Sequence, residues 1–213
     1  YMATVLITGT SKGIGFESAL AFARAGHIVF ATMRNPAQSP LAETAAKESL
    51  PITVSTMDVD SDESVSDGIA AILKARPIDV LINNVGDMAV DQMSWRELTP
   101  ESIDHTLSVD IKGTMLMTHE FGRRMLDDQK SGTIVNIGSR VVVEGSPRAP
   151  QYAAAKYAIL GISKSYARAL APHVRVNTLG PGFVETEALK NREDWKSGRR
   201  EQVLAHTPMN RIP

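Results

Sequence analysis

The sequence predicts a single α/β domain in which a parallel β-sheet is covered by helices on both faces. Short runs rich in β-branched residues alternate with longer amphipathic stretches along most of the chain, a pattern typical of βαβ units. The 213 residues are 43% hydrophobic, which is enough for one well-buried core. No linker or low-complexity segment interrupts the alternation, so we expect one domain over residues 1–213.

Six short apolar runs bounded by turn residues are predicted to be strands: residues 3–8, 28–33, 53–58, 80–83, 133–139 and 175–179. Five helices are predicted to begin near Gly13, Pro40, Asp62, Pro100 and Gln151. The starts at Asp62 and Pro100 combine capping residues with acidic residues in the first turn, which is typical of helix N-termini. After Pro181 the pattern loosens, and residues 183–207 are predicted to form a mobile substrate flap.

Composition narrows the possible partners and compartment. Lys and Arg total 23 against 24 Asp and Glu, so the net charge of -1 predicts no nucleic-acid partner and no attraction to an anionic membrane. The apolar runs are far shorter than the roughly 18 residues of a membrane span, and cysteine is absent, which fits a cytoplasmic protein. The five histidines lack metal-site spacing, so no metal is expected.

The first predicted strand leads into a glycine-rich turn, LITGTSKGIG, over residues 6–15. Its glycines, Gly9, Gly13 and Gly15, have the spacing G-x-x-x-G-x-G. Without Cβ atoms they permit a tight turn and let the backbone approach a pyrophosphate at the N-terminus of the next helix. Many strand-to-helix turns need glycine for conformational reasons alone, so the turn by itself leaves nucleotide binding open.

The end of the second strand indicates which dinucleotide would bind. An acidic residue there would hold the ribose of NAD, but the chain has Met33 followed by Arg34. Lys12 and Arg34 could clamp the extra phosphate of NADP with charge-assisted hydrogen bonds. The alternative is that both are ordinary solvated loop cations. The sequence therefore favours NADP(H).

A possible proton-transfer group follows the fifth strand. Ser139 ends that strand, and Tyr152 and Lys156 are four residues apart at the start of a helix, so they share one helical face. A nearby cation stabilises the phenolate form of a tyrosine, which would let Tyr152 exchange a proton with a substrate oxygen that Ser139 also holds. The alternative is a surface tyrosine and lysine on an amphipathic helix.

Together these residues resemble the short-chain dehydrogenases/reductases in their shorter, non-extended branch, which includes 3-oxoacyl-acyl-carrier-protein reductases and hydroxysteroid dehydrogenases. The matching motifs are Thr8-Gly9-x-x-x-Gly13-Ile14-Gly15, Asp58-Val59, Asn83-Asn84-Val85-Gly86, Ser139, Tyr152-x-x-x-Lys156 and Pro181-Gly182-x-x-x-Thr186. The resemblance implies a Rossmann-like, doubly wound fold with three α/β/α layers. It also implies a homodimer or homotetramer that interconverts a carbonyl and a secondary alcohol by hydride transfer.

The resemblance also implies roles for individual residues. Tyr152 would be the catalytic acid/base, Lys156 would stabilise its phenolate and bind the nicotinamide ribose, and Ser139 would orient the substrate oxygen. The residues implied to bind the cofactor are Gly9, Ser11, Lys12, Gly13, Ile14, Gly15, Arg34, Asp58, Val59, Asn83, Gly86, Tyr152, Lys156, Pro181, Gly182 and Thr186.

The sequence departs from the family pattern in three places, one of which is Val85 where the family usually has alanine, a packing adjustment near the cofactor face. Asp110 stands where the family usually has an asparagine that supports a water linked to the catalytic lysine. Its charge would favour protonated Lys156 and partly offset the pull of that cation on Tyr152, leaving either a tolerated change or an impaired relay. Family members also generally continue for another helix and a seventh strand, whereas this sequence ends at Pro213. Either that last helix and strand lie beyond the given residues, or the protein is a shortened member that lacks them.

These inferences converge on an NADP(H)-dependent oxidoreductase of carbonyl and alcohol groups. The apolar segments at residues 141–143 and 183–184 suit a hydrophobic small-molecule substrate, and the loop after Gly86 is expected to contribute to its selection. An alternative of another class is a catalytically impaired redox sensor that retains the NADP(H) site. An epimerase or dehydratase of the extended branch is disfavoured by the glycine spacing and the short chain.

Overall fold

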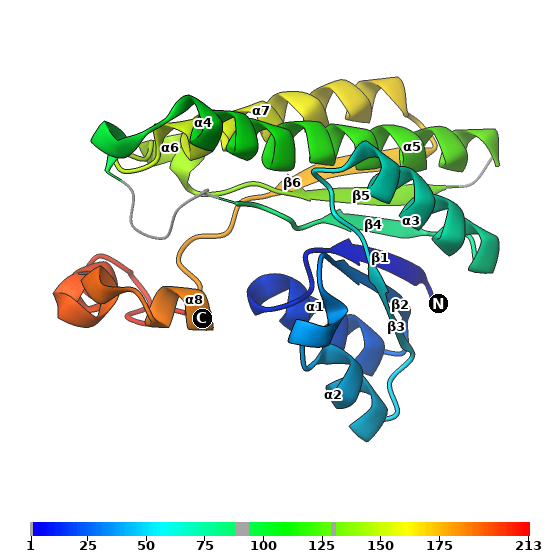
Figure 1. Cartoon of the computed structure of the whole chain (residues 1–213), viewed down its shortest axis with the longest axis horizontal. Coiled ribbons are helices and arrows are strands. Elements are labelled where there is room, and N and C mark those ends of the chain that lie inside the picture. The colour runs from blue at the N-terminus through cyan, green and yellow to red at the C-terminus, as the bar shows by residue number, and fades with distance from the viewer. Residues whose placement is uncertain (1, 88–93, 129–130) are drawn as a thin grey trace.

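A computed structural model describes residues 2–87, 94–128 and 131–213 of the chain. Its centre is a sheet of six parallel strands in the order β3-β2-β1-β4-β5-β6 (Figure 1). The strands are β1 Thr4–Thr8, β2 Ile28–Met33, β3 Ile52–Thr56, β4 Val80–Asn83, β5 Gly132–Ile137 and β6 Val174–Leu179. The predicted Rossmann-like parallel sheet is therefore confirmed.

Helices lie on both sides of this sheet (Figure 1). One side holds α1 Gly13–Arg24 and α2 Leu41–Lys47, and the other holds α3 Asp62–Ala75, α5 Gly113–Asp127 and α7 Pro150–Ala169. The helix α4 Pro100–Thr106 continues through a π-helical segment, η3 Leu107–Lys112, into α5. The shorter elements are η1 Pro36–Gln38, η2 Trp95–Glu97, α6 Val141–Glu144, α8 Glu187–Lys190, η4 Trp195–Arg199 and α9 Arg200–Ala205.

Alternating side chains of the buried strands form two apolar cores, one on each face of the sheet. Leu6 of β1 packs with residues of α3, α5 and α7, whereas its neighbours Val5 and Ile7 pack with residues of α1 and α2. This division follows from the strand geometry, in which successive side chains point to opposite faces. On the α1 face, β6 exposes Arg175, Asn177 and Leu179.

The predicted boundaries differ from the structure by one residue at the starts of the first, third, fifth and sixth strands, by two residues at the ends of the third and fifth strands, and at one loop. The third strand ends at Thr56 because the chain turns towards α3, where the backbone N–H of Asp58 donates to Ser64 Oγ at 2.9 Å. The fifth strand ends at Ile137, so Ser139 lies beyond it. The segment after Ser139, where the sequence predicts no helix, forms the short helix α6, and Ser139 Oγ accepts a hydrogen bond from the N–H of Val141 at 3.3 Å.

A buried polar network joins three strands to two helices. Asn83 Nδ2 donates to Asn136 Oδ1 at 2.8 Å and to Thr118 Oγ1 at 3.0 Å. Asn136 Nδ2 donates to Ser163 Oγ at 2.9 Å, and Thr178 Oγ1 donates to the same oxygen at 2.7 Å. Buried polar groups require such partners, and these hydrogen bonds can all form only when the helices and strands are packed in this one arrangement. The network therefore fixes α5 and α7 against β4, β5 and β6.

Two methionines of α5 provide a matched test of the core. Met117 is fully buried, whereas Met115 is 42% exposed on the same helix. Met117→Ala is expected to lower the free energy of unfolding by about 2–5 kcal/mol because it leaves a cavity, and Met115→Ala by less than about 1 kcal/mol. Urea denaturation followed by circular dichroism would measure both. Equal losses would contradict this packing.

Candidate active site

Two cavities lie at the carboxyl ends of the strands. The first, of about 410 Å³, lies where the strand order reverses between β1 and β4, the place at which open parallel sheets bind ligands. The second, of about 400 Å³, is bounded by α6, the start of α7 and the segment after β6. Tyr152 lines both cavities and therefore lies at their junction.

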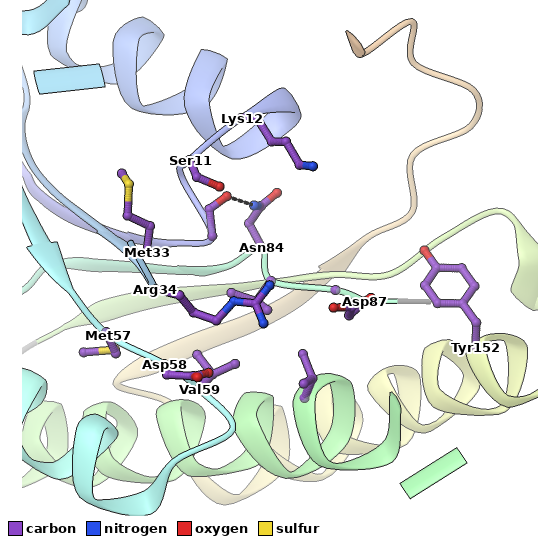
Figure 2. Close-up of a pocket in the computed structure, with 14 residues that line it drawn as sticks. Ser11, Lys12, Met33, Arg34, Met57, Asp58, Val59, Asn84, Asp87 and Tyr152 are labelled. Atoms are coloured by element: carbon purple, nitrogen blue, oxygen red, sulfur yellow. Dashed lines mark hydrogen bonds between the residues drawn. The ribbon is translucent and has the colours of Figure 1, made fainter. Parts of the chain in front are cut away.

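The glycine turn forms one wall of the first cavity (Figure 2). Gly9 has φ 69°, and a Cβ on it would lie 2.9 Å from Val85 Cγ2. A Cβ on Gly15 would collide with the carbonyl oxygen of Gly9. Asn84 holds the turn from the other side, because its Nδ2 donates to the carbonyl oxygens of Thr8 and Gly9, each at 3.0 Å. The turn therefore presents backbone to the cavity and has no room for larger residues.

The N-terminus of α1 at this turn fits the pyrophosphate of a dinucleotide. Lys12 at the cap position makes no capping hydrogen bond with its side chain, and the first turn contains no acidic residue. The first backbone N–H groups of a helix lack partners within the helix, and the helix dipole favours an anion beside them. This arrangement of free donors and glycines is one that a dinucleotide phosphate would complete.

Two cations from different strands line the same cavity. Lys12 follows β1 and Arg34 follows β2; both are exposed, and neither forms an ion pair with any residue in the described part of the chain. Figure 2 shows Ser11 and Lys12 on one side of the cavity and Asp58 and Val59 on the other. The structure thus brings the predicted residues of the first three strand ends around one cavity.

Tyr152, Lys156 and Ser139 also come together. Lys156 Nζ lies 5.4 Å from the ring centroid of Tyr152, one helical turn earlier on α7. The lysine is only 3% exposed, and its Nζ donates to the carbonyl oxygen of Ile137 at 3.3 Å. Ser139 lines the second cavity together with Tyr152. Two residues that carry hydroxyl groups therefore line one cavity, and an ammonium lies beside the tyrosine ring.

Asp110 meets Lys156 directly. Its Oδ2 lies 3.1 Å from Lys156 Nζ, and its Oδ1 accepts a hydrogen bond from the backbone N–H of Asp87 at 2.7 Å. Both partners of this ion pair are buried, Asp110 completely. Burial raises the pKa of the Asp110 carboxyl, and the positive charge of Lys156 acts in the opposite direction. Asp110 therefore links the loop after β4 to the lysine beside Tyr152.

A known protein family matches most of the chain. The chain matches the short chain dehydrogenase family over residues 3–197. It belongs to that family. A 2-dehydro-3-deoxy-D-gluconate 5-dehydrogenase of Bacillus subtilis (strain 168) is 32% identical over 210 residues, which are 98% of this chain and 81% of the relative. A 3-oxoacyl-(acyl-carrier-protein) reductase of Thermotoga maritima is 33% identical over 212 residues, 97% of this chain and 83% of the relative.

A solved structure has the same fold. A variant of the actinorhodin polyketide ketoreductase, crystallised with NADPH, superimposes with a TM-score of 0.89 at 27% identity, covering 100% of this chain and 85% of that chain. This short chain dehydrogenase is thus an oxidoreductase of CH–OH and C=O groups. Within the described ranges, no helix is long and apolar enough to cross a bilayer, and no three His, Cys, Asp or Glu side chains gather as metal ligands do.

The remaining residues predicted to bind the cofactor of this short chain dehydrogenase lie in the second cavity, in the first cavity and in the segment after β6. Ile14, Gly182 and Thr186 line the second cavity, and a Cβ on Gly13 would lie 3.3 Å from Thr186 Cγ2. Gly86 lines the first cavity with Tyr152. The carbonyl oxygen of Pro181 accepts a hydrogen bond from the N–H of Arg140 at 3.0 Å, which ties the segment after β6 to the segment after β5.

Asn83 does not line either cavity. Its side chain is buried in the polar network, and its neighbour Asn84 lines the first cavity instead. The reason is that β4 ends here and successive side chains point in opposite directions. The sequence predicts Asn83 beside the cofactor, and of the Asn83-Asn84 pair it is Asn84 that lines the first cavity. Residues 88–93 of the loop after Gly86 lie outside the described residues.

Proposed function

We propose that this protein interconverts a carbonyl and a secondary alcohol with NADP(H), using Tyr152 as the acid/base. The observation that carries the proposal is the position of Tyr152, which lines both cavities while Ser139 shares its second cavity and Lys156 lies beside it. The first cavity suits the dinucleotide and the second suits the substrate. Their junction is where a reacting carbonyl would meet a proton donor.

The residues of the chain bind the substrate oxygen and transfer one proton to or from it. A bound nicotinamide cofactor supplies the hydride. During reduction, the Tyr152 hydroxyl donates its proton to the substrate oxygen, and the Ser139 hydroxyl donates a hydrogen bond to the same oxygen. The charge of Lys156 stabilises the phenolate that remains on Tyr152. During oxidation the phenolate takes the proton back from the alcohol.

The preference for NADP(H) rests on the electrostatics of the first cavity. Lys12 and Arg34 supply two cations that form no ion pair with a described carboxylate, at the position where the extra phosphate would lie, although Asp58 and Asp87 line the same cavity. Ser11 lines the same wall, and Asp58 and Val59 form the side suited to the adenine. The NADPH in the related ketoreductase structure supports the same choice.

Asp110 acts in this proposal as a positioning residue. It touches Lys156 rather than the cavities, and burial of both groups keeps the ammonium at a fixed place beside Tyr152. Its carboxylate also holds the N–H of Asp87, a residue that lines the first cavity. Asp110 thus fixes the position of Lys156 and of Asp87, which lines the first cavity.

Further features of the proposal concern the substrate and its surroundings. Apolar side chains, among them Val141, Phe183 and Val184, line the second cavity and suit a substrate with a hydrophobic portion. We propose that residues 183–207 form a flap that moves as the substrate enters. The cysteine-free composition supports a cytoplasmic location, and a homodimer or homotetramer is proposed from the family resemblance.

The acid/base role is tested by Tyr152→Phe, with Tyr157→Phe on the exposed face of the same helix as the control. Tyr152→Phe is expected to abolish ketone-dependent NADPH oxidation, because the proton donor is lost, while NADPH binding by fluorescence titration is kept. Tyr157→Phe should retain both. Substantial turnover by Tyr152→Phe would refute the assignment, and tight NADPH binding without turnover by the wild type would favour a redox sensor.

The phosphate clamp is tested by Arg34→Asp. The loss of one charge-assisted contact and the new repulsion are expected to weaken NADPH binding by about 10- to 100-fold, with little change for NADH. Arg76→Asp, at an exposed arginine after α3, is the control and should leave both affinities unchanged. Equal losses for the two cofactors in Arg34→Asp would exclude the clamp.

The influence of Asp110 is tested by the pH dependence of Asp110→Asn. Without the carboxylate, Lys156 stabilises the phenolate of Tyr152 more strongly, so the alkaline limb of the rate profile for reduction is expected to move to lower pH. Because burial raises the pKa of Asp110, the wild-type carboxyl becomes neutral in acid and the two profiles should converge there. Asp104→Asn, exposed on α4, is the control. Superimposable profiles would show that the charge has no role.

A further inference from the structure

The second cavity carries an excess of positive charge. Four arginines from four segments of the chain line it: Arg140, Arg148, Arg192 and Arg199. Among the described residues that line this cavity, Glu144 is the one acidic side chain. Guanidinium groups bind carboxylate and phosphate groups with paired, charge-assisted hydrogen bonds. The cavity that holds Ser139 and Tyr152 is therefore also suited to an anion.

The carboxylates near these arginines neutralise only part of their charge. Arg148 Nη1 and Arg192 Nη2 share one carboxylate, Asp194, at 2.5 and 2.7 Å. The hydrogen bonds from Arg192 and Arg148 lower the pKa of Asp194 to about 2, so it is ionised at neutral pH. Arg140 pairs with Glu144. The four guanidinium groups therefore have two carboxylates as ion-pair partners, which leaves an excess of positive charge.

Arg199 is the cation that remains free. It is exposed and forms no ion pair with any residue that the structure describes, although it lines the cavity. The segment that carries it is anchored by Trp195, which is 3% exposed, lies 5.3 Å from the ring of Phe183 and donates from Nε1 to Glu185 at 3.3 Å. A buried anchor thus holds an unpaired guanidinium at the cavity wall.

Arg140 connects this charge to the reacting end of the cavity. It directly follows Ser139, and its guanidinium carbon lies 4.4 Å from the ring centroid of Phe183. Its backbone N–H is held by Pro181, so both the backbone and the side chain bind the segment after β6. A single exposed arginine would indicate nothing, because solvated surface cations are common. Here the arginines gather at the cavity that contains the proton donor.

We infer that the substrate is an anionic carbonyl compound, whose carboxylate or phosphate binds the arginines while its carbonyl oxygen meets Ser139 and Tyr152. This inference rests on the proposed function and names the substrate class for the same site. The apolar side chains of Val141, Phe183 and Leu189 accommodate the carbon chain between the two groups. The substrate is therefore amphipathic, with its anionic end towards Arg199.

Matched substrates test the inference. NADPH oxidation is measured with acetoacetate and levulinate, each beside its methyl ester, and with dihydroxyacetone phosphate beside dihydroxyacetone. The anionic member of at least one pair is expected to have a kcat/KM about tenfold higher or more, the size of one charge-assisted hydrogen bond. The acids and the phosphate separate the two kinds of anion. Neutral partners that react equally well would overturn the inference but keep the proposed function; no turnover of any compound would count against the proposed function.

Arg199→Ala locates the anion site, with Arg168→Ala, at an exposed position of α7 outside both cavities, as the control. Arg199→Ala is expected to lower kcat/KM for the preferred anion by about tenfold and to change that for its neutral partner by less than about twofold. Arg168→Ala should change neither. Equal losses for the anion and its neutral partner would overturn the inference.

A binding measurement without turnover separates affinity from catalysis. Titration calorimetry in the presence of NADP compares pentanoate with pentanamide, which differ in charge and lack a ketone. The wild type is expected to bind pentanoate at least about tenfold more tightly, and Arg199→Ala is expected to lose that difference. Equal binding of the two compounds by the wild type would overturn the inference.

Discussion

The buried ion pair between Lys156 and Asp110 is the interaction on which the site depends. A buried charge requires a partner, and removal of one member of such a pair costs about 3–5 kcal/mol. Lys156 on α7 also donates to Ile137 of β5, and Asp110 in η3 also accepts from Asp87 after β4. One pair of charges therefore joins a helix, a π-helical segment and two strand ends. Tyr152 lies one helical turn from this junction.

The parallel sheet explains why residues from the whole chain meet there. All six strands run in the same direction, so their carboxyl ends lie at one edge, and the order reverses between β1 and β4. The glycine turn follows β1, Arg34 follows β2, and Ser139 follows β5. The buried amide network of Asn83 and Asn136 holds the helices that carry the remaining groups. The precision of the site thus comes from interior contacts.

The features that could be predicted from the sequence are those set by local patterns. Strand and helix periodicity predicted the sheet and its helices, and the spacing of Gly9, Gly13 and Gly15 predicted a turn that presents backbone to a cavity. The helical spacing of Tyr152 and Lys156 predicted a shared face, which the distance of 5.4 Å confirms. These patterns need only neighbours along the chain.

Other features required contacts that no local pattern records. Whether Asn83 or Asn84 lines the first cavity depends on the residue at which β4 ends. The gathering of Arg148 and Arg192 around Asp194 joins the start of α7 to the segment after α8, which only the folded chain brings together. The sequence therefore predicted an apolar substrate wall and missed the cations beside it.

Deuterium transfer tests whether hydride transfer takes place at the junction of the two cavities beside Tyr152. NADPH carrying deuterium at both hydrogens of nicotinamide C4 is incubated with a carbonyl compound of the panel that the protein reduces, and the alcohol product is analysed by mass spectrometry. The wild type is expected to give deuterium on the carbinol carbon, and Tyr152→Phe is expected to give no labelled alcohol. An alcohol without deuterium, or equal labelling by the two proteins, would contradict hydride transfer at this junction.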